Sequence, residues 1–209
     1  MPLQNRVTPL GELVADRARG LVYGNRGCLH DDEQRIRRSW QVKRWIACRL
    51  EFKGRTRELM QPGRYTELFF LDEATAFAAG HRPCAECRRP DYDRFVGVVG
   101  MRADAIDECL HAERLDSSER RLHRASAAGL PNGAFVLDEG QPWLVLDSEL
   151  LRWTPAGYAE RQPRPDGETT LITPPTLVDV LRSGWQGDVD FLHPTARQPN
   201  VDPGGAGSF

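Results

Sequence analysis

The sequence predicts an α+β fold. Residues 20–71 contain short alternating apolar runs typical of strands, residues 72–129 contain capped helical segments, and residues 134–172 contain short strands separated by turn residues. The chain has 209 residues, with 40% hydrophobic and 28% charged residues, which is an ordinary globular composition. This length suits one large domain or two small ones.

The first part of the chain predicts strands among loops. We expect an irregular arm over residues 1–20 and a short strand in GLVYGNRG. DDEQRIRRSWQVKR is polar and predicts a helix, whereas WIACRLEF alternates and predicts a strand. The KG turn at residues 53–54 then joins this strand to RTRELM, so we predict a hairpin over residues 45–60.

Helical segments follow a further strand in YTELFFL. A short helix is expected from Asp72 to Ala79, because Gly80 is suited to end it. Two more helices are predicted, over residues 91–100 and 103–115. Asp116 and Glu119 resemble a capping box, which predicts a further helix that ends near residue 129.

The C-terminal part predicts a small antiparallel meander. The runs AFVLD, PWLVLD, LLRWTPAGYA and TTLIT are separated by turn residues, and TPPTLVDVLRSGW predicts a helix after them. The tail, 194–209, is rich in Pro and Gly and is expected to be disordered. We therefore expect a module at 1–101, a helical connector at 102–129, a β-rich unit at 130–193 and the tail.

Charge is unevenly distributed along a nearly neutral chain. The net charge is −2, yet residues 35–57 hold nine basic residues and one acid. A basic patch on a neutral protein is typical of phosphate contact, although it can also be an ordinary solvated surface. No apolar run is long enough for a membrane helix, and the first 20 residues lack a signal-peptide core, so a cytoplasmic protein is expected.

Five cysteines in such a chain favour metal binding or free thiols over disulfides. Cys84 and Cys87 form a Cys-x-x-Cys pair in AAGHRPCAECRRPDY, which offers half of a tetrahedral zinc site. The pair follows a predicted helix end rather than a strand, which favours a metal site over a thioredoxin-like redox pair. The candidates for the remaining ligands are Cys28, His30, Cys48 and His81.

The stretch LFFLDEATAFAAGHRPCAEC, residues 68–87, resembles the Ada-type metal-binding domain of methylphosphotriester DNA-repair proteins. The resemblance implies an Ada-like zinc module with a β-hairpin and short helices, in which Cys84 and Cys87 bind zinc. The family takes its other ligands from a Cys-x-x-x-Cys after the hairpin, and one of them is the methyl acceptor. LMQPGRYTE has no cysteine at the corresponding place, so methyl transfer is not implied.

Two sets of ligands therefore remain open. Cys48 can replace one missing ligand, with Cys28 or His30 as the other. Alternatively, Cys28 and His30 serve together, and Cys48 lies in the core.

The resemblance also implies DNA binding, because a zinc-fixed loop would direct Arg82, Arg88 and Arg89 outward toward phosphates. The same role is expected for the basic residues of the predicted hairpin region, namely Lys43, Arg44, Arg55 and Arg57. Trp40 and Trp45 flank two of these cations and can stack on an exposed base, although core packing is the alternative for both.

A second candidate site lies in the helical connector. Glu113 falls on the apolar stripe of its predicted helix, and two helices packed antiparallel would bring His111, Glu113 and His123 together. Such a cluster can be an acid–base site, a second metal site or a structural ion-pair network.

Three functions follow from these observations. The first is a zinc-dependent DNA-binding protein in repair or modification. The second is a DNA-acting hydrolase or glycosylase with a structural zinc and an acid–base site between the modules. The third is a protein whose basic patch meets an acidic partner. No nucleotide-binding, hydrolase-elbow or zincin motif is present.

Overall fold

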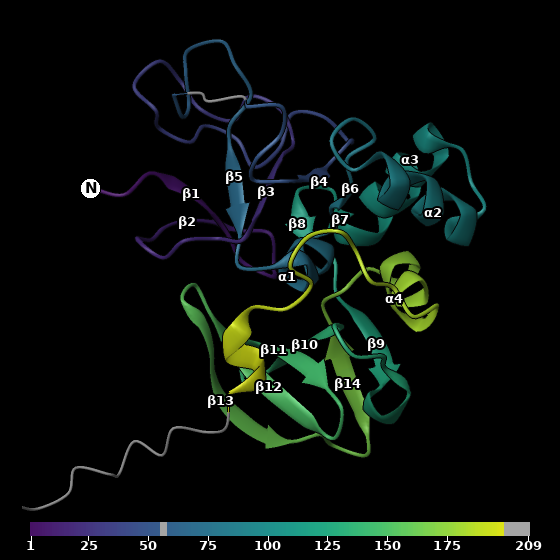
Figure 1. Ribbon diagram of the computed structural model, residues 1–209. Helices are drawn as coiled ribbons and strands as arrows, with labels where there is room; N and C mark the ends of the chain where they lie inside the picture. Colours follow the sequence, from purple (N-terminus) through teal and green to yellow (C-terminus); the bar gives the residue numbers. More distant parts are fainter. Residues whose placement is uncertain (55–57, 199–209) are drawn as a thin grey trace, which may run out of the picture.

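Two six-stranded sheets lie on opposite sides of a short central helix in the computed structural model, which describes residues 1–54 and 58–198 (Figure 1). The helix, α1 (Glu73–Ala78), is buried along its whole length. A helix that is buried on every face needs partners on every side, and α1 contributes to each of the three apolar clusters found among the described residues. The α+β prediction is confirmed.

The N-terminal sheet is mixed and has the strand order β2-β1-β5-β3-β4-β6. Two pairings are parallel, β1 with β5 and β4 with β6, and the others are antiparallel. Its strands are β1 (Gln4–Val7), β2 (Leu13–Ala15), β3 (Val22–Asn25), β4 (Ile46–Cys48), β5 (Leu68–Phe70) and β6 (Arg82–Pro83). The strands predicted in GLVYGNRG, WIACRLEF and YTELFFL are confirmed.

Two predictions for the N-terminal part are wrong. Residues 1–20 are not an irregular arm, because β1 and β2 pair with each other and extend the sheet. Residues 31–44 form no helix. Instead, the Asp31 side chain accepts hydrogen bonds from the backbone of Glu33 and Arg35 and pairs with two arginines, which stabilises a loop in place of a helical turn.

The second strand of the predicted hairpin falls on RTRELM, of which residues 55–57 lie outside the described part. Residues 58–60 are not in a strand. The first strand, β4, instead pairs with β3 and β6. Strand β4 therefore pairs with strands from distant parts of the sequence, whereas the sequence indicated pairing with the segment that follows it.

The helices around α1 agree with the sequence in all but one case. The Asp72 side chain caps α1, and Gly80 follows its end with φ of +88°. Helices α2 (Arg89–Val99), α3 (Ala103–Arg114) and α4 (Pro175–Arg182) confirm three further predictions. Near α1, α2 contributes Phe95 to the same apolar cluster as the other two helices.

The helix predicted over residues 116–129 is wrong. This segment forms the hairpin β7 (Leu115–Asp116) and β8 (Glu119–Arg120), the strand β9 (His123–Ser126) and a short 3-10 turn at Ala127–Gly129. Asp and Ser favour turns as strongly as they favour helix caps, and Ser117 has the positive φ of a tight turn. The capping-box pattern here marks a hairpin turn.

The C-terminal sheet is antiparallel throughout, with the order β13-β12-β11-β10-β14-β9, which confirms the antiparallel meander. Its other strands are β10 (Phe135–Asp138), β11 (Gln141–Leu146), β12 (Glu149–Thr154), β13 (Gly157–Pro163) and β14 (Glu168–Leu171). Of the tail, Pro194–Arg197 forms a 3-10 turn against β13, and residues 199–209 lie outside the described part.

The division into modules at 1–101, 102–129 and 130–193 stays a prediction. Among the described residues, no helix is long and apolar enough to cross a membrane.

Candidate metal centre

Strand pairing brings Cys48 beside the Cys-x-x-Cys loop. Strand β6 runs parallel to β4, with Ala47 opposite Pro83, and the backbone N–H of Cys84 donates to the carbonyl of Ala47. Cys48 ends β4 and Cys84 follows β6, so both thiols reach the same end of the two strands. The loop then turns through Cys87 into α2.

The Sγ atoms of Cys48, Cys84 and Cys87 all lie within 4.8 Å of one another. Zinc–sulfur bonds of about 2.3 Å in a tetrahedral site place two sulfurs about 3.8 Å apart. The cluster is therefore compatible with a metal ion such as zinc. No disulfide links any of the five cysteines.

Hydrogen bonding within the cluster makes Cys84 the most acidic of the three thiols. Hydrogen bonds from Cys48 and Cys87, and from the backbone of the loop, lower the pKa of Cys84 against the opposing effect of burial. Hydrogen bonds with the other two cysteines, together with burial, raise the pKa of Cys48. A thiophilic cation can bind such a cluster, because it takes the place of the thiol protons and the thiolate is the form of cysteine that binds metal.

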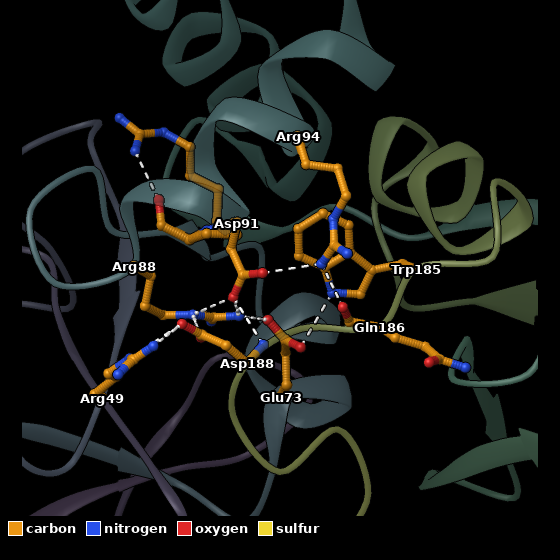
Figure 2. A network of polar contacts seen from close by, with 10 residues as sticks. Arg49, Glu73, Arg88, Asp91, Arg94, Trp185, Gln186 and Asp188 are labelled. Atoms are coloured by element: carbon orange, nitrogen blue, oxygen red, sulfur yellow. Dashed lines mark hydrogen bonds and ion pairs between the residues drawn. The ribbon is translucent and has the colours of Figure 1, made fainter.

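A buried ion-pair network holds the two cysteine segments together (Figure 2). Arg49 directly follows Cys48, and Arg88 directly follows Cys87. Both guanidinium groups bind the carboxylate of Asp188, Arg49 through Nε at 3.0 Å and Arg88 through Nε at 2.9 Å. Asp188 therefore joins the end of β4 to the start of α2, which restrains the spacing of the sulfurs.

Arg88 is the centre of this network. Its side chain is fully buried and donates to Glu73 at 2.5 Å and to Asp91 at 2.7 Å. The indole N–H of Trp185 donates to the other oxygen of Glu73, and the backbone N–H of Asp188 donates to Asp91 (Figure 2). The carboxylates thus have several partners each, which the burial of such charges requires.

The remaining candidate ligands are not part of the three-sulfur cluster. The Cys28 thiol contacts the carbonyl of His30 at 3.6 Å. The ring of His30 bonds to the Thr66 hydroxyl and the carbonyl of Gln61. His81 is buried against the rings of Trp45 and Phe70. Of the ligand sets left open by the sequence, the cluster agrees with the one that includes Cys48, but neither Cys28 nor His30 joins it as the fourth ligand.

All three cysteines line one cavity of about 540 Å³, which lies within the usual range of small-molecule sites. Its wall also includes aromatic side chains of β3, β5 and the adjoining loops, namely Tyr23, Phe52, Tyr65 and Phe69. Arg44 and Arg49 line it as well. Arg44 was predicted from the sequence as a functional residue, whereas Arg49, Asp188 and the aromatic wall were not. The alternation in VYGN and ELFF was the available signal for the wall.

The expectation that Arg82 and Arg88 point outward is wrong. Arg82 is 3% exposed and makes two hydrogen bonds of 2.8 Å to the carboxylate of Asp107, and Arg88 belongs to the buried network. The two arginines pair with carboxylates inside the protein, and their guanidinium groups are therefore not directed outward to contact phosphates. Arg89 is exposed and pairs with Asp93.

The other predicted nucleic-acid contacts are two exposed residues, Lys43 and Arg44, and two residues outside the described part of the chain. Lys43 is exposed and pairs with Glu108, whereas the exposed Arg44 lines the cavity. Arg55 and Arg57 lie outside the described part of the chain. Contact of Lys43, Arg44 and Arg89 with nucleic acid stays a prediction.

The two tryptophans considered for base stacking have partners within the protein. Trp45 is 2% exposed and its ring contacts the guanidinium groups of Arg26 and Arg114, so core packing is the correct alternative for it. Trp40 is half-buried against the ring of His111.

The side chains of His111, Glu113 and His123 each have a separate contact. The Glu113 carboxylate accepts hydrogen bonds from the backbone N–H and the hydroxyl of Thr176, at the start of α4. His123 bonds to the backbone carbonyl of Glu113 rather than to its carboxylate. His111 stacks edge-on against Trp40. These contacts favour a structural role, and catalysis by the three residues stays a prediction.

Comparison with protein-family models, curated proteins and solved structures finds no match to the chain. The three-cysteine cluster and its surroundings are therefore the features of the chain that bear on function.

Proposed function

We propose that the protein binds zinc through Cys48, Cys84 and Cys87 and contacts nucleic acid with the surface around this centre. The observation that carries the proposal is the three-sulfur cluster, whose members come from two segments 36 residues apart. Thiolates select soft or borderline metals, and zinc is the usual choice where a Cys-x-x-Cys turn provides two of them.

The zinc would join the edge of the N-terminal sheet to the start of α2. Cys48 belongs to β4, and Cys87 lies two residues before α2. A metal bond across this junction adds to the ion pairs of Asp188 and stabilises the folded chain, because the unfolded chain has no assembled site.

The nucleic-acid part of the proposal is supported by the exposed cations near the centre and by the resemblance of residues 68–87 to a DNA-repair domain. Arg44 and Arg49 line the cavity beside the cysteines, and Arg89 lies just beyond the loop. DNA repair or modification is the context that the resemblance adds. The alternative, a DNA-acting hydrolase or glycosylase, receives less support, because the side chains of its acid–base residues have separate contacts.

Native mass spectrometry of the full chain tests the zinc site. The wild type and the Cys109→Ser variant should each carry one zinc, because Cys109 lies outside the cluster and contacts Glu113 and Thr176. The Cys84→Ser variant should carry none. A metal-free wild type, purified under reducing conditions with zinc supplied, would refute the proposal.

Fluorescence anisotropy with labelled single-stranded and duplex DNA tests the nucleic-acid part. Binding should weaken steeply with salt, and Arg44→Gln should reduce the salt slope by about the share of one phosphate contact. Arg124→Gln is the matched control, since Arg124 is exposed on β9 and does not line the cavity. Absence of binding at low salt, or equal effects of the two variants, would contradict a nucleic-acid surface at the centre.

A further inference from the structure

One face of the N-terminal sheet forms part of the cavity wall beside the three cysteines. Side chains alternate between the two faces of a strand, so Tyr23 of β3, Cys48 of β4 and Phe69 of β5 share this face. The opposite face packs into the core, where Val22 and Phe70 are fully buried. Tyr23 and Phe69 are only half-buried, although large aromatic side chains are usually well covered.

The strand register places these side chains in one row across four strands. Cys48 is opposite Tyr23, Tyr23 is opposite Phe69, and Phe69 is opposite Arg6 of β1. Directly opposite residues have Cβ atoms about 4.5–5.5 Å apart, so the Tyr23 side chain leaves the backbone next to that of Cys48. The rings of Tyr23 and Phe69 lie 5.8 Å apart, and the guanidinium of Arg6 lies 4.8 Å from the Phe69 ring. A thiol, two aromatic rings and a cation thus follow one another along the sheet.

Polar side chains line the cavity beside this row. Asn25 lies two residues after Tyr23, and Glu67 lies two residues before Phe69, so each shares the face of its aromatic neighbour. One carboxylate oxygen of Glu67 accepts a hydrogen bond of 2.7 Å from the backbone of Met60, which fixes the buried side chain in place. The cavity therefore offers an amide and a fixed carboxylate next to aromatic surface.

The metal centre contributes three protein ligands to this cavity. Among the described residues, no fourth histidine, cysteine or carboxylate joins the cluster. A tetrahedral metal with three protein ligands keeps one position for an outside ligand, which is the arrangement of sites that bind substrates. All three cysteines line the cavity, so an outside ligand of the metal has space there.

We propose that this cavity binds a planar heteroaromatic ring of the nucleobase type, which stacks on the Tyr23–Phe69 row and completes the coordination of the metal with a ring nitrogen. This inference rests on the proposed zinc site. Aromatic side chains stack on any base, because every base has a π face, and imidazole-like nitrogens are good ligands of zinc. An amide and a carboxylate suit the hydrogen-bonding edge of such a ring.

Other ligand classes fit the cavity less well. A phosphate group deep in the cavity would meet the Glu67 carboxylate and the thiolates, whose negative charges disfavour it, and of the two lining arginines Arg49 is already paired with Asp188. An aliphatic ligand would gain nothing from the aromatic row beyond burial. A base attached to a single strand would instead leave its phosphates in solvent at the cavity entrance, within reach of the exposed lining residue Arg44.

The test uses the full chain loaded with Co²⁺ in place of zinc, because the visible spectrum of cobalt reports its ligands. Adenosine, guanosine, cytidine and uridine are titrated separately. We expect at least one nucleoside to shift the cobalt bands saturably. Phe69→Leu should keep the cobalt spectrum of the free protein but weaken this nucleoside by about tenfold or more, the effect of losing one base–aromatic stack. Tyr92→Leu is the matched control, since Tyr92 lies on α2 outside the cavity, and it should change the affinity less than twofold.

The outcomes separate the two proposals. Failure to bind Co²⁺ before any nucleoside is added refutes the metal site itself. A normal cobalt spectrum that no nucleoside changes overturns only the present inference, as does a response that Phe69→Leu leaves intact. Fluorescein-labelled (dA)₈ distinguishes the two sources of the ring. Tighter, salt-dependent binding than adenosine indicates a base within a nucleic acid, and equal, salt-independent binding indicates a free nucleoside.

Discussion

Replacing Arg88 with Met should destabilise the protein far more than the same change at the next residue. Arg88 is 0% exposed and pairs with Glu73, which is also 0% exposed, and with Asp91, at 6%. Removing one partner of a buried ion pair leaves the other charges uncompensated and costs about 3–5 kcal/mol. Arg89→Met is the matched control, because Arg89 and its partner Asp93 are 66% and 55% exposed, and such surface pairs contribute about 0–1 kcal/mol.

Urea denaturation followed by tryptophan fluorescence measures both free energies of unfolding. Adding Glu73→Gln to the Arg88→Met variant should recover part of the loss, because it removes one uncompensated charge. If Arg88→Met and Arg89→Met differ by less than about 1 kcal/mol, the buried network does not stabilise the fold as argued here.

The Arg88→Met variant should also respond to pH in a specific direction. Burial raises the pKa of Glu73 even in the wild type, where the charge of Arg88 opposes the shift. Without Arg88 the pKa of Glu73 rises further, so folding takes up a proton. The loss of stability in the variant should therefore shrink as the pH falls from neutral toward the ordinary carboxyl range near about 4. A loss that stays constant with pH would contradict this explanation.

Three further predictions concern single residues. Glu113→Ala should cost about 1 kcal/mol in denaturant unfolding, because the carboxylate satisfies the first turn of α4; an unchanged midpoint would exclude this capping role. Hydrogen bonds with neighbouring groups and the charge of a buried arginine outweigh burial and lower the pKa of Asp188 to about 2, so its stabilisation is complete above about pH 4 and is lost as the pH falls toward 2. Asp188→Asn should remove this part of the acid sensitivity, and an unchanged acid profile would contradict it. Gly80→Ala should lower the melting temperature, because φ is +88° and the added Cβ would lie 2.6 Å from Arg114, whereas Gly97→Ala in the open interior of α2 should raise it; the same sign for both would contradict the glycine argument.

Local patterns predicted the elements whose stability is local. The helix predicted from Asp72 to Ala79 forms as α1, and Gly80 follows its end as the sequence indicates. The C-terminal strands were predictable for the same reason, since turn residues separate them and each strand pairs mostly with its neighbours.

Long-range pairing explains what the sequence did not predict. The register of β4 with β6 brings Cys48 to Cys84, and the sequence offered Cys48 only as one alternative among several. Arg88 is buried against Glu73 of α1 and Asp188 of the C-terminal part as well as against Asp91, and the first two partners come from distant segments, so an arginine beside a cysteine loop was interpreted as a surface cation. In both cases the decisive partner comes from another element, and no local pattern contains it.

Zinc K-edge X-ray absorption of the full chain tests the three-cysteine centre most directly. We expect three sulfur ligands at about 2.3 Å and one lighter nitrogen or oxygen ligand at about 2.0–2.1 Å, with the sulfur signal reduced or lost in Cys48→Ser. Four sulfur ligands would bring a cysteine from outside the cluster, such as Cys28, into the site. That result, or a zinc ion without sulfur ligands, would contradict the centre formed by Cys48, Cys84 and Cys87.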